Sequence, residues 1–465
     1  MKKLLLAFAL STFALSSAVA AAQSIPAPEM VIQDVTVVNV ATGEELHGQT
    51  VHVQGSRIVS VGPSQQNGPA TQDVIDAHGG YLIPGLWDMH IHIHNTEELP
   101  LYIANGVTGV RLMAGDQKSA ALRAELSRVT PSPEIDLASA IVDGSSPMWP
   151  GSIVVKNPAD ARKAVDEIKA GGADFIKVYD GIPRSAYFAL ADEAKRQHIE
   201  FEGHVPIAVT DQEASAAGQR SIEHLTGIAL ACSSDQESLM GAMERAPYFR
   251  DRLAVQAEGY RTLDSKKCTA LFAEFRANDT WQVPTLTVLR MWGRLDDRKL
   301  TSDPRLTYID HKSRNGWLDR TMPQQRRWNS MMFQMARGIF SVDEQMVANL
   351  YRAGVPLMAG TDAMNPYCFP GFSLHDELSL LVASGLTPLA ALQATTLNPA
   401  RFLGRTAELG SIEPGKTANL VLLRADPLVD IHNTTQIEAV WLRGQYFDRN
   451  ALDSMLEHAK QAAKH

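Results

Sequence analysis

The segment Asp88-Met-His90-Ile-His92 carries the residue types in this chain that are best suited to chemistry. Alternate residues of a β-strand point to the same face, so His90 and His92 would lie side by side. Two neutral imidazoles at this spacing can hold one divalent metal ion. A single histidine in an apolar run is usually a packed core residue, but two beside an aspartate would each need a hydrogen-bond partner if buried. The spacing therefore predicts part of a metal site, whose other ligands come from elsewhere in the chain.

The elements that must position this segment alternate between strand-like and helix-like patterns over residues 84–403. Eight repeats of this alternation favour an α/β fold in which parallel strands close into a (β/α)8 barrel of the TIM type. We expect the strands near Trp87, Val110, Leu137, Ile176, Phe201, Ile222, Thr285 and Leu357. The seventh of them is expected over residues 282–289. An open doubly wound sheet is the alternative, although no glycine-rich dinucleotide-binding motif follows the first strand.

Two helix-like insertions interrupt the alternation, over residues 227–279 and 291–344. Both follow predicted strand ends, so we expect them to cover the carboxyl-terminal face of the barrel, either as a lid or as peripheral decoration. Residues 30–83 and 404–450 show β patterns instead, with turns at glycine. We expect these two segments to join into one small composite β-sandwich.

Further candidate ligands stand at the ends of predicted barrel strands. They follow the fourth, fifth, sixth and eighth strands and are Lys177, His204, His224 and Asp362. Each alone carries little weight, because a strand-end His or Asp is more often a structural hydrogen-bonding residue. Together they share one rim of a barrel with the two alternating histidines, which is where barrel enzymes keep their active sites. Lys177 could bind a metal only after chemical modification, because an ammonium group has no lone pair.

Several motifs resemble those of the metal-dependent amidohydrolase superfamily, in particular its imidazolonepropionase-like and Xaa-Pro dipeptidase-like branch. The resemblance rests on the run from Ile75 to His92 and on Phe175-Ile-Lys177-Val, Glu202-Gly-His204, Ile222-Glu-His224-Leu, Ala359-Gly-Thr-Asp362 and Leu409-Gly-Ser-Ile-Glu-Pro-Gly-Lys. It covers nearly all of the chain after residue 22. The chain departs from the usual pattern at Asn419, where relatives carry Asp, and over residues 110–115, where relatives carry Val-Arg-Asp-Met-Gly-Gly.

The resemblance implies a binuclear metal centre. The implied ligands are His90, His92 and Asp362 for one divalent ion, and His204 and His224 for the second, with carboxylated Lys177, formed with CO2, as the bridge. Zinc is the default for such ligands, which also suit manganese, iron, cobalt and nickel. Two ions would lower the pKa of a bridging water and so supply hydroxide near neutral pH. Asp362 would be the catalytic residue that takes the proton and passes it to the leaving nitrogen.

Three more residues are candidates for substrate contact. Tyr179 would face inward near the rim and could hydrogen-bond a substrate carbonyl or carboxylate, or pack as an aromatic residue. Arg111, at the end of the second strand, could bind a carboxylate. His94 continues the alternation of the histidines further out, as a loop residue or a substrate contact. Asp88 would lie deeper in the barrel, where it would support a ligating histidine.

The implied function is hydrolysis of an amide-type C–N bond in a small-molecule substrate, such as an N-acyl amino acid or a dipeptide. Hydrolysis of an ester, a lactone or a phosphotriester by the same site is an alternative among enzymes. An exported binding protein that has lost catalysis is an alternative of a different class. However, a protein that loses catalysis normally loses metal ligands as well, and all six candidate ligands are present here.

The N-terminus has the pattern of a secretory signal peptide over residues 1–22. Lys2 and Lys3 precede an apolar run, and Ala18-Val19-Ala20 fits a cleavage site, so we expect export across the inner membrane to the periplasm. The formal net charge is −9, or −11 without Lys2 and Lys3. This balance argues against nucleic-acid and anionic-membrane partners. The sequence leaves open whether the chain forms a homo-oligomer.

The chain has three cysteines, Cys232, Cys268 and Cys368. An odd number in an exported chain suggests one disulfide and one free thiol. Cys232 and Cys268 are the favoured pair because both lie in one helical stretch, and three free thiols are the alternative. No base partner is evident for Cys368, so we expect no cysteine nucleophile.

Overall fold

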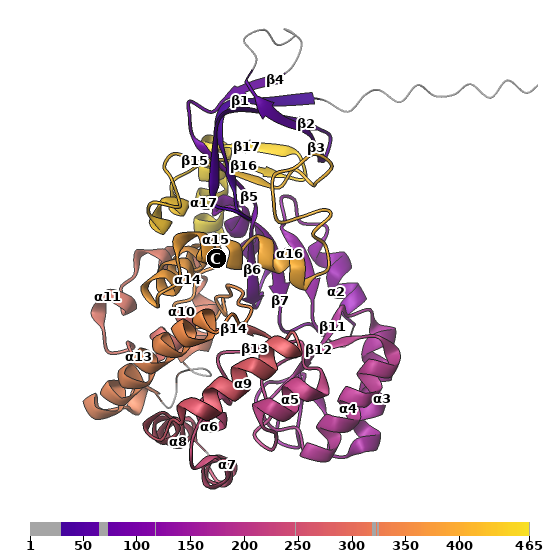
Figure 1. Cartoon of the computed structure of the whole chain (residues 1–465), viewed down its shortest axis with the longest axis vertical. Helices are drawn as coiled ribbons and strands as arrows, with labels where there is room; N and C mark the ends of the chain where they lie inside the picture. The colour runs from indigo at the N-terminus through magenta and orange to yellow at the C-terminus, as the bar shows by residue number, and fades with distance from the viewer. Residues whose placement is uncertain are drawn as a thin grey trace, which may run out of the picture.

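In the computed structural model, the described residues are 29–64, 73–116, 118–246, 248–318, 322 and 325–464. A mixed β-sheet lies at one end of the molecule, and strands flanked by helices make up the rest (Figure 1). The signal peptide expected over residues 1–22 lies outside the described residues and stays a prediction. In the described ranges, every helix is too short or too polar to cross a membrane.

The two terminal β segments pair in one eight-stranded sheet, with the order β17-β16-β15-β5-β1-β2-β3 and with β4 beside β1. The first segment contributes β1 (Glu29–Asn39), β2 (Glu44–Gln54), β3 (Arg57–Pro63), β4 (Asp73–Asp76) and β5 (Tyr81–Pro84). The last contributes β15 (Leu420–Leu423), β16 (Ile437–Leu442) and β17 (Gln445–Asp448). They meet where β5 and β15 run antiparallel, with Val421 opposite Ile83. The two segments are thus joined in one hydrogen-bonded sheet and share a hydrophobic core, and the sandwich arrangement stays a prediction.

Parallel strands follow this sheet and confirm the α/β class. One three-stranded sheet consists of β6 (Leu86–Ile91), β7 (Val107–Leu112) and β8 (Glu134–Leu137). A second, with the order β10-β9-β11-β12-β13-β14, consists of β9 (Val142–Asp143), β10 (Ile153–Val154), β11 (Phe175–Val178), β12 (Glu200–Gly203), β13 (Ser221–Glu223) and β14 (Trp281–Val283). Every residue of β6, β7, β11, β13 and β14 is buried, as expected where helices cover a parallel sheet, whereas β8 and β10 are partly exposed.

Isolated parallel bridges connect these sheets. Ala138, just after β8, pairs with Phe175 of β11, and Gln282 of β14 pairs with Leu357. The chain beyond Leu357 then runs beside β6, where the Met89 amide donates to the Ala359 carbonyl at 2.9 Å. The eighth predicted strand is therefore a short bridged segment at the expected place, between the first and the seventh strands.

The seventh predicted strand is wrong beyond Val283, where β14 ends. Thr285 has a φ of 51°, outside the extended region, and α10 (Leu286–Trp292) begins directly after it. The Glu377 carboxylate accepts hydrogen bonds from the first two amides of α10, at 2.9 and 2.7 Å, and so stabilises the start of the helix. A short apolar run fits a strand or a buried helix equally well, and this distant carboxylate favours the helix.

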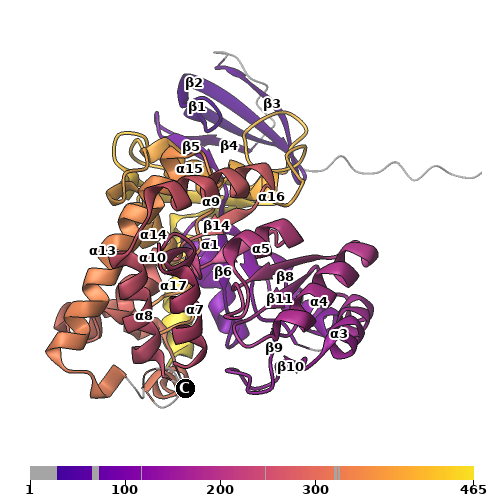
Figure 2. The same cartoon turned by 60° about the horizontal axis from the view of Figure 1, so that its bottom comes forward.

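Helices flank the parallel strands on the outside (Figures 1 and 2). They are α1 (Leu99–Ala104), α2 (Ser119–Leu126), α3 (Pro158–Gly171), α4 (Arg184–Gln197), α5 (Asp211–Ala217), α14 (Phe372–Ala383), α15 (Pro388–Ala394) and α16 (Leu397–Phe402). Short 3-10 helices are η1 (Thr96–Glu98), η2 (Pro304–Tyr308), η4 (Gln325–Arg327) and η5 (Ile431–Thr435). A last helix, α17 (Arg449–Ala462), packs against α1 and extends past the β pattern that was expected to end the fold.

The two insertions are helical, as their patterns predict. The first, between β13 and β14, contains α6 (Ile228–Ala231), α7 (Gln236–Glu244), α8 (Phe249–Arg261) and α9 (Ser265–Ala277). The second follows α10 and contains α11 (Arg298–Thr301), α12 (His311–Gly316) and α13 (Ser330–Arg352). A disulfide between Cys232 and Cys268, with Cα atoms 4.7 Å apart, ties the end of α6 to α9. Cys368 is free and buried, so the prediction of one pair and one thiol is confirmed.

Candidate metal centre

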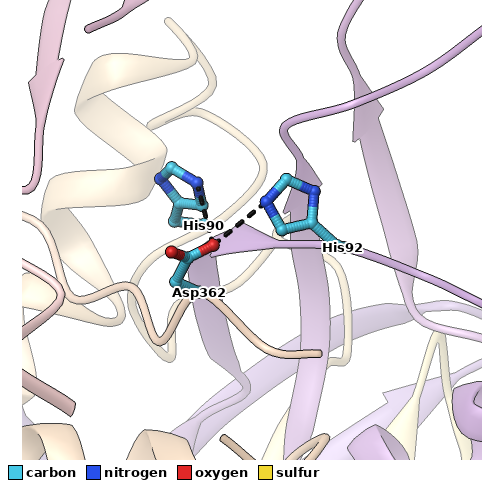
Figure 3. A group of neighbouring side chains, drawn as sticks. All are labelled: His90, His92 and Asp362. Carbon is cyan, nitrogen blue, oxygen red and sulfur yellow. Dashed lines mark ion pairs between the residues drawn. The ribbon is translucent and has the colours of Figure 1, made fainter. Parts of the chain in front are cut away.

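Three predicted ligands meet at the end of β6. Figure 3 shows His90 and His92 facing Asp362, which comes from the loop after Leu357. The Asp362 Oδ1 lies 3.4 Å from His90 Nε2 and 3.0 Å from His92 Nε2. One ligand atom from each residue lies within 4.8 Å of the others. The strand brings the two imidazoles together, and the Asp362 amide, which donates to the His90 carbonyl at 2.7 Å, holds the loop against them.

The chemistry of this cluster fits a divalent metal ion. His90 Nε2 is buried and makes no hydrogen bond to any described residue. A buried polar atom without a partner costs free energy, which coordination of a cation would recover. Burial holds the pKa of the His90 imidazole well below its ordinary value, so the ring is neutral and keeps a lone pair for a metal. His90, His92 and Asp362 can therefore hold one ion.

The other predicted ligands line the same cavity, which has a volume of about 630 Å³. The ring centroid of His224 lies 4.6 Å from that of His90 and 4.9 Å from that of His204. His224 Nε2 lies 3.9 Å from Asp362 Oδ2. Lys177 of β11 is buried, and this burial lowers the pKa of its ammonium group to about 8. The structure thus brings all six predicted ligand residues to one cavity.

Three of the cavity histidines are oriented through Nδ1 by residues that the sequence did not single out. The contacts are His90 with Glu223 at 2.7 Å, His204 with Asp180 at 2.7 Å, and His224 with Thr285 at 2.6 Å. Such partners fix the plane of the ring and leave Nε2 for a metal. Glu223 directly precedes one candidate ligand, so a carboxylate beside a ligand was an available signal. Thr285 gave no such signal, because the run around it was expected to be a strand.

Arg111 does not line the cavity, which corrects the prediction that it binds a substrate carboxylate. It is fully buried among the parallel strands. Its guanidinium group donates to Glu202 at 2.5 Å, to Glu223 at 2.8 Å and to the Met89 carbonyl at 2.7 Å. Its donors are therefore used inside the protein, where they hold the carboxylate that orients His90.

Asp88 supports both the loop that carries Asp362 and the backbone of His90. Its carboxylate accepts hydrogen bonds from the Thr361 amide at 3.0 Å and the Thr361 hydroxyl at 2.7 Å. It also lies 3.4 Å from the backbone amide of His90. Burial raises the pKa of Asp88 to about 8. This residue therefore positions the segment that carries Asp362 and also supports His90 through its backbone amide, in agreement with the expected support of a ligating histidine.

The other two candidates for substrate contact lie in different cavities. Tyr179 lines the first cavity, where its ring stacks on His204 with centroids 4.1 Å apart and its hydroxyl accepts from Trp149 Nε1 at 3.0 Å. His94 lines a second cavity of about 1330 Å³. The two cavities share His92 and Trp149 in their walls, so they adjoin. Tyr179 can still donate its hydroxyl proton to a ligand.

Comparisons with known proteins agree with this geometry. The amidohydrolase family matches residues 299–446. An adenine deaminase of Rubrobacter xylanophilus is 25% identical, over 85% of this chain and 54% of that protein, so the chain spans about half the length of this curated relative.

Among solved structures, bottromycin amidohydrolase superposes with a TM-score of 0.73 at 24% identity and covers 93% of this chain and 90% of its own. A Xaa-Pro dipeptidase with bound methionine superposes with a TM-score of 0.66 at 18% identity and covers 90% of this chain and 100% of its own. The chain is therefore similar to the amidohydrolase family in sequence over residues 299–446, and similar to amidohydrolase structures in fold over most of its length.

Proposed function

We propose that this protein is an exported, binuclear metal-dependent amidohydrolase that cleaves an amide-type C–N bond in a small molecule such as an N-acyl amino acid or a dipeptide. The observation that carries this proposal is the meeting of six predicted ligand residues at one cavity. The likeness to an adenine deaminase supports hydrolysis at a C–N bond. The likeness to a Xaa-Pro dipeptidase supports a peptide-like substrate.

A closed (β/α)8 barrel is part of the proposal. The bridges Ala138–Phe175, Gln282–Leu357 and Ile91–Ala363 support a ring of parallel strands that returns to β6. The candidate ligands follow the carboxyl ends of those strands, the face on which barrel enzymes hold their active sites.

In this proposal the donor set divides between two metal ions, zinc by default. The residues are His90, His92 and Asp362 for one ion, and His204 and His224 for the other, with carboxylated Lys177 as the shared ligand. Because burial lowers the pKa of Lys177 to about 8, a good part of its amine is neutral near that pH and able to react with CO2. The bound ions would polarise the scissile carbonyl and lower the pKa of a water in the site.

Asp362 carries the proton in the proposed reaction. The attacking water gives its proton to the Asp362 carboxylate, and its oxygen bonds to the carbonyl carbon. The C–N bond then breaks as Asp362 passes the proton to the leaving nitrogen, which yields a carboxylic acid and an amine. Burial alone would raise the pKa of Asp362, but His224 and His92 outweigh it and keep the carboxyl below its ordinary pKa. It is therefore ionised and ready to accept a proton at neutral pH.

Export to the periplasm is supported by the signal-like pattern of residues 1–22 and by the disulfide between Cys232 and Cys268, a bond that persists in oxidising compartments. The proposed partner is a small-molecule substrate, and the acidic charge balance disfavours nucleic acid and anionic membranes.

The test combines metal analysis with turnover of matched amides and esters, on protein reconstituted with zinc and bicarbonate. We expect two ions per chain and amide hydrolysis. Replacing His204→Ala should remove one ion together with activity, whereas His458→Ala, an exposed change on α17, should alter neither. Asp362→Asn should lower kcat by about 10²- to 10⁴-fold. Turnover of esters alone would assign an esterase, and two bound ions without any turnover would favour a binding protein.

A further inference from the structure

The cavity that contains the candidate metal ligands extends between the helices of the two insertions. There its wall is lined by apolar side chains of α7, α8, α10 and α13, namely Met240, Phe249, Leu253, Leu289, Trp292 and Ile339. We call the space between these six residues the insertion chamber. Because the chamber and the metal centre belong to one cavity, a single ligand can occupy both.

The chamber wall keeps apolar surface accessible inside the molecule. Met240, Leu289 and Trp292 are only partly buried although they line this cavity. Phe249 lies 5.3 Å from Trp292 between ring centroids and stacks parallel to Trp328 at 6.1 Å, which fixes an aromatic corner. Accessible apolar surface of this kind gains free energy when an apolar ligand covers it, roughly in proportion to the area removed from water.

Helix α8 connects the chamber to the metal centre. Arg252 of this helix donates to Asp180 at 3.0 Å, and Asp180 contacts His204 Nδ1 at 2.7 Å. Leu253 and Phe249, which line the chamber, lie one and three residues from Arg252. Arg252 and Phe249, three residues apart, share one face of α8, so this face contacts the partner of His204 at one point and lines the chamber at the next.

Two of the charged groups beside the chamber are paired within the protein. Arg252 pairs with Asp180, and the Tyr260 hydroxyl donates to Asp343. Burial also raises the pKa of Asp343 to about 7, so near neutral pH this group is partly uncharged. The chamber thus offers a substrate mainly apolar contact.

We propose that the insertion chamber binds a bulky apolar group of the substrate, an aliphatic acyl chain or an aromatic ring, next to the amide bond that is cleaved. This inference rests on the proposed amidohydrolase function and narrows its substrate class to amides with a large apolar group. Substrates with a small acyl group, which would leave the chamber wall uncovered, should be cleaved less efficiently.

The first experiment measures kcat/KM of the zinc-loaded, full-length protein on acetyl-, butanoyl-, hexanoyl- and octanoylglycine. We expect a rise of about fourfold for each methylene that the chamber buries. A flat series would overturn the chamber proposal while leaving amide hydrolysis intact. Absence of turnover on every amide would instead count against the proposed function.

A binding measurement tests the insertion chamber independently of the proposed amide hydrolysis. Calorimetric titration of metal-free protein with butanoate, hexanoate and octanoate reports on the chamber without catalysis. Affinity that rises with chain length, with a negative heat-capacity change, supports the chamber even for an inactive protein. Equal or undetectable binding of all three chains would overturn it.

Substitutions in the cavity wall test whether the dependence of kcat/KM on acyl-chain length arises in the insertion chamber. Met240→Gln keeps the size of the side chain but places a polar amide on the wall, so the octanoyl-to-acetyl ratio of kcat/KM should fall by about tenfold. Met243→Gln, on the same helix and in the same cavity wall, is a second variant should the first fail to fold. Met331→Gln on α13 is the control, because its side chain is 74% exposed to solvent. Equal ratios in the cavity variants and the control would contradict the proposal.

Discussion

The two halves of the candidate metal centre are supported by different parts of the molecule. His90 is oriented by Glu223, which is fully buried and paired with Arg111 among the parallel strands. His204 is oriented by Asp180, whose side chain is 25% exposed and pairs with Arg252 of an insertion helix. The first support belongs to the core, and the second depends on a helix that also lines the insertion chamber.

Because of this difference, the buried contacts of Glu223 should matter most for folding stability, and the contact of Asp180 with Arg252 should matter most for metal and ligand binding. A buried ion pair that loses one partner leaves an uncompensated charge, at a large cost in folding free energy. A partly exposed pair loses less, because water can solvate the remaining charge. Substitutions in the Glu223–Arg111 pair should therefore destabilise the fold. Substitutions in the Asp180–Arg252 pair should instead alter metal and ligand binding.

The largest effect is expected for Arg111→Met. The change leaves Glu202 and Glu223 buried without their cation, so the free energy of unfolding should fall by about 3–5 kcal/mol. Urea denaturation followed by circular dichroism measures this loss. Arg123→Met breaks a partly exposed pair with Asp174 and should cost at most about 1 kcal/mol. Similar losses for the two variants would contradict the role given to Arg111.

The second largest effect is expected on folding stability when the disulfide of the first insertion is removed. Cys232→Ser with Cys268→Ser opens a disulfide whose cysteines are 36 residues apart, and loop entropy predicts a loss of about 3–4 kcal/mol. Scanning calorimetry measures it, and a Cys368→Ser variant, which leaves the disulfide in place, is the comparison. Thiol titration of denatured, unreduced wild type should find one thiol, and three would rule out the disulfide.

A smaller effect is expected for Arg252→Met. Asp180 would lose its cation, and the His204 half of the site should bind metal about tenfold more weakly, with little change in stability. Competition with a chelator measures the two affinities. Arg250→Met, on the exposed side of the same helix, is the control. An equal loss of affinity at both of the proposed metal sites would show that the halves are not supported separately.

The smallest effect is a change in pH dependence. Burial raises the pKa of Asp343 to about 7, well above its value of about 3.9 in an unfolded chain. The folded protein therefore keeps a proton that the unfolded chain releases, and this stabilisation is complete below pH ~4 and is lost as the pH rises through about 7. Asp343→Asn should reduce the fall in stability between pH 5 and pH 8 by roughly 1 kcal/mol or more. Thermal unfolding at both pH values tests this, with exposed Asp453→Asn as the control.

Much of the candidate site could be read from local patterns. The alternation of His90 and His92 predicts a shared face because a strand has a period of two residues. Lys177 follows a short apolar run that ends a strand, and the structure places it on β11 as expected. The prediction was wrong where a local pattern fits two kinds of structure. The apolar run after Thr285 fits a strand or a helix, and it forms α10.

The sequence by itself determined which side chains can bind a metal and which strand ends carry them. Only the tertiary structure decided what holds them. Arg111 meets Glu202 and Glu223 across 91 and 112 residues of chain, and these contacts turned a candidate for substrate binding into a support for His90. The apolar wall of the insertion chamber likewise combines residues from two insertions. The physical reason is that periodicity is a property of neighbouring residues, whereas the partners of a buried charge or an apolar surface are set by the packing of distant segments.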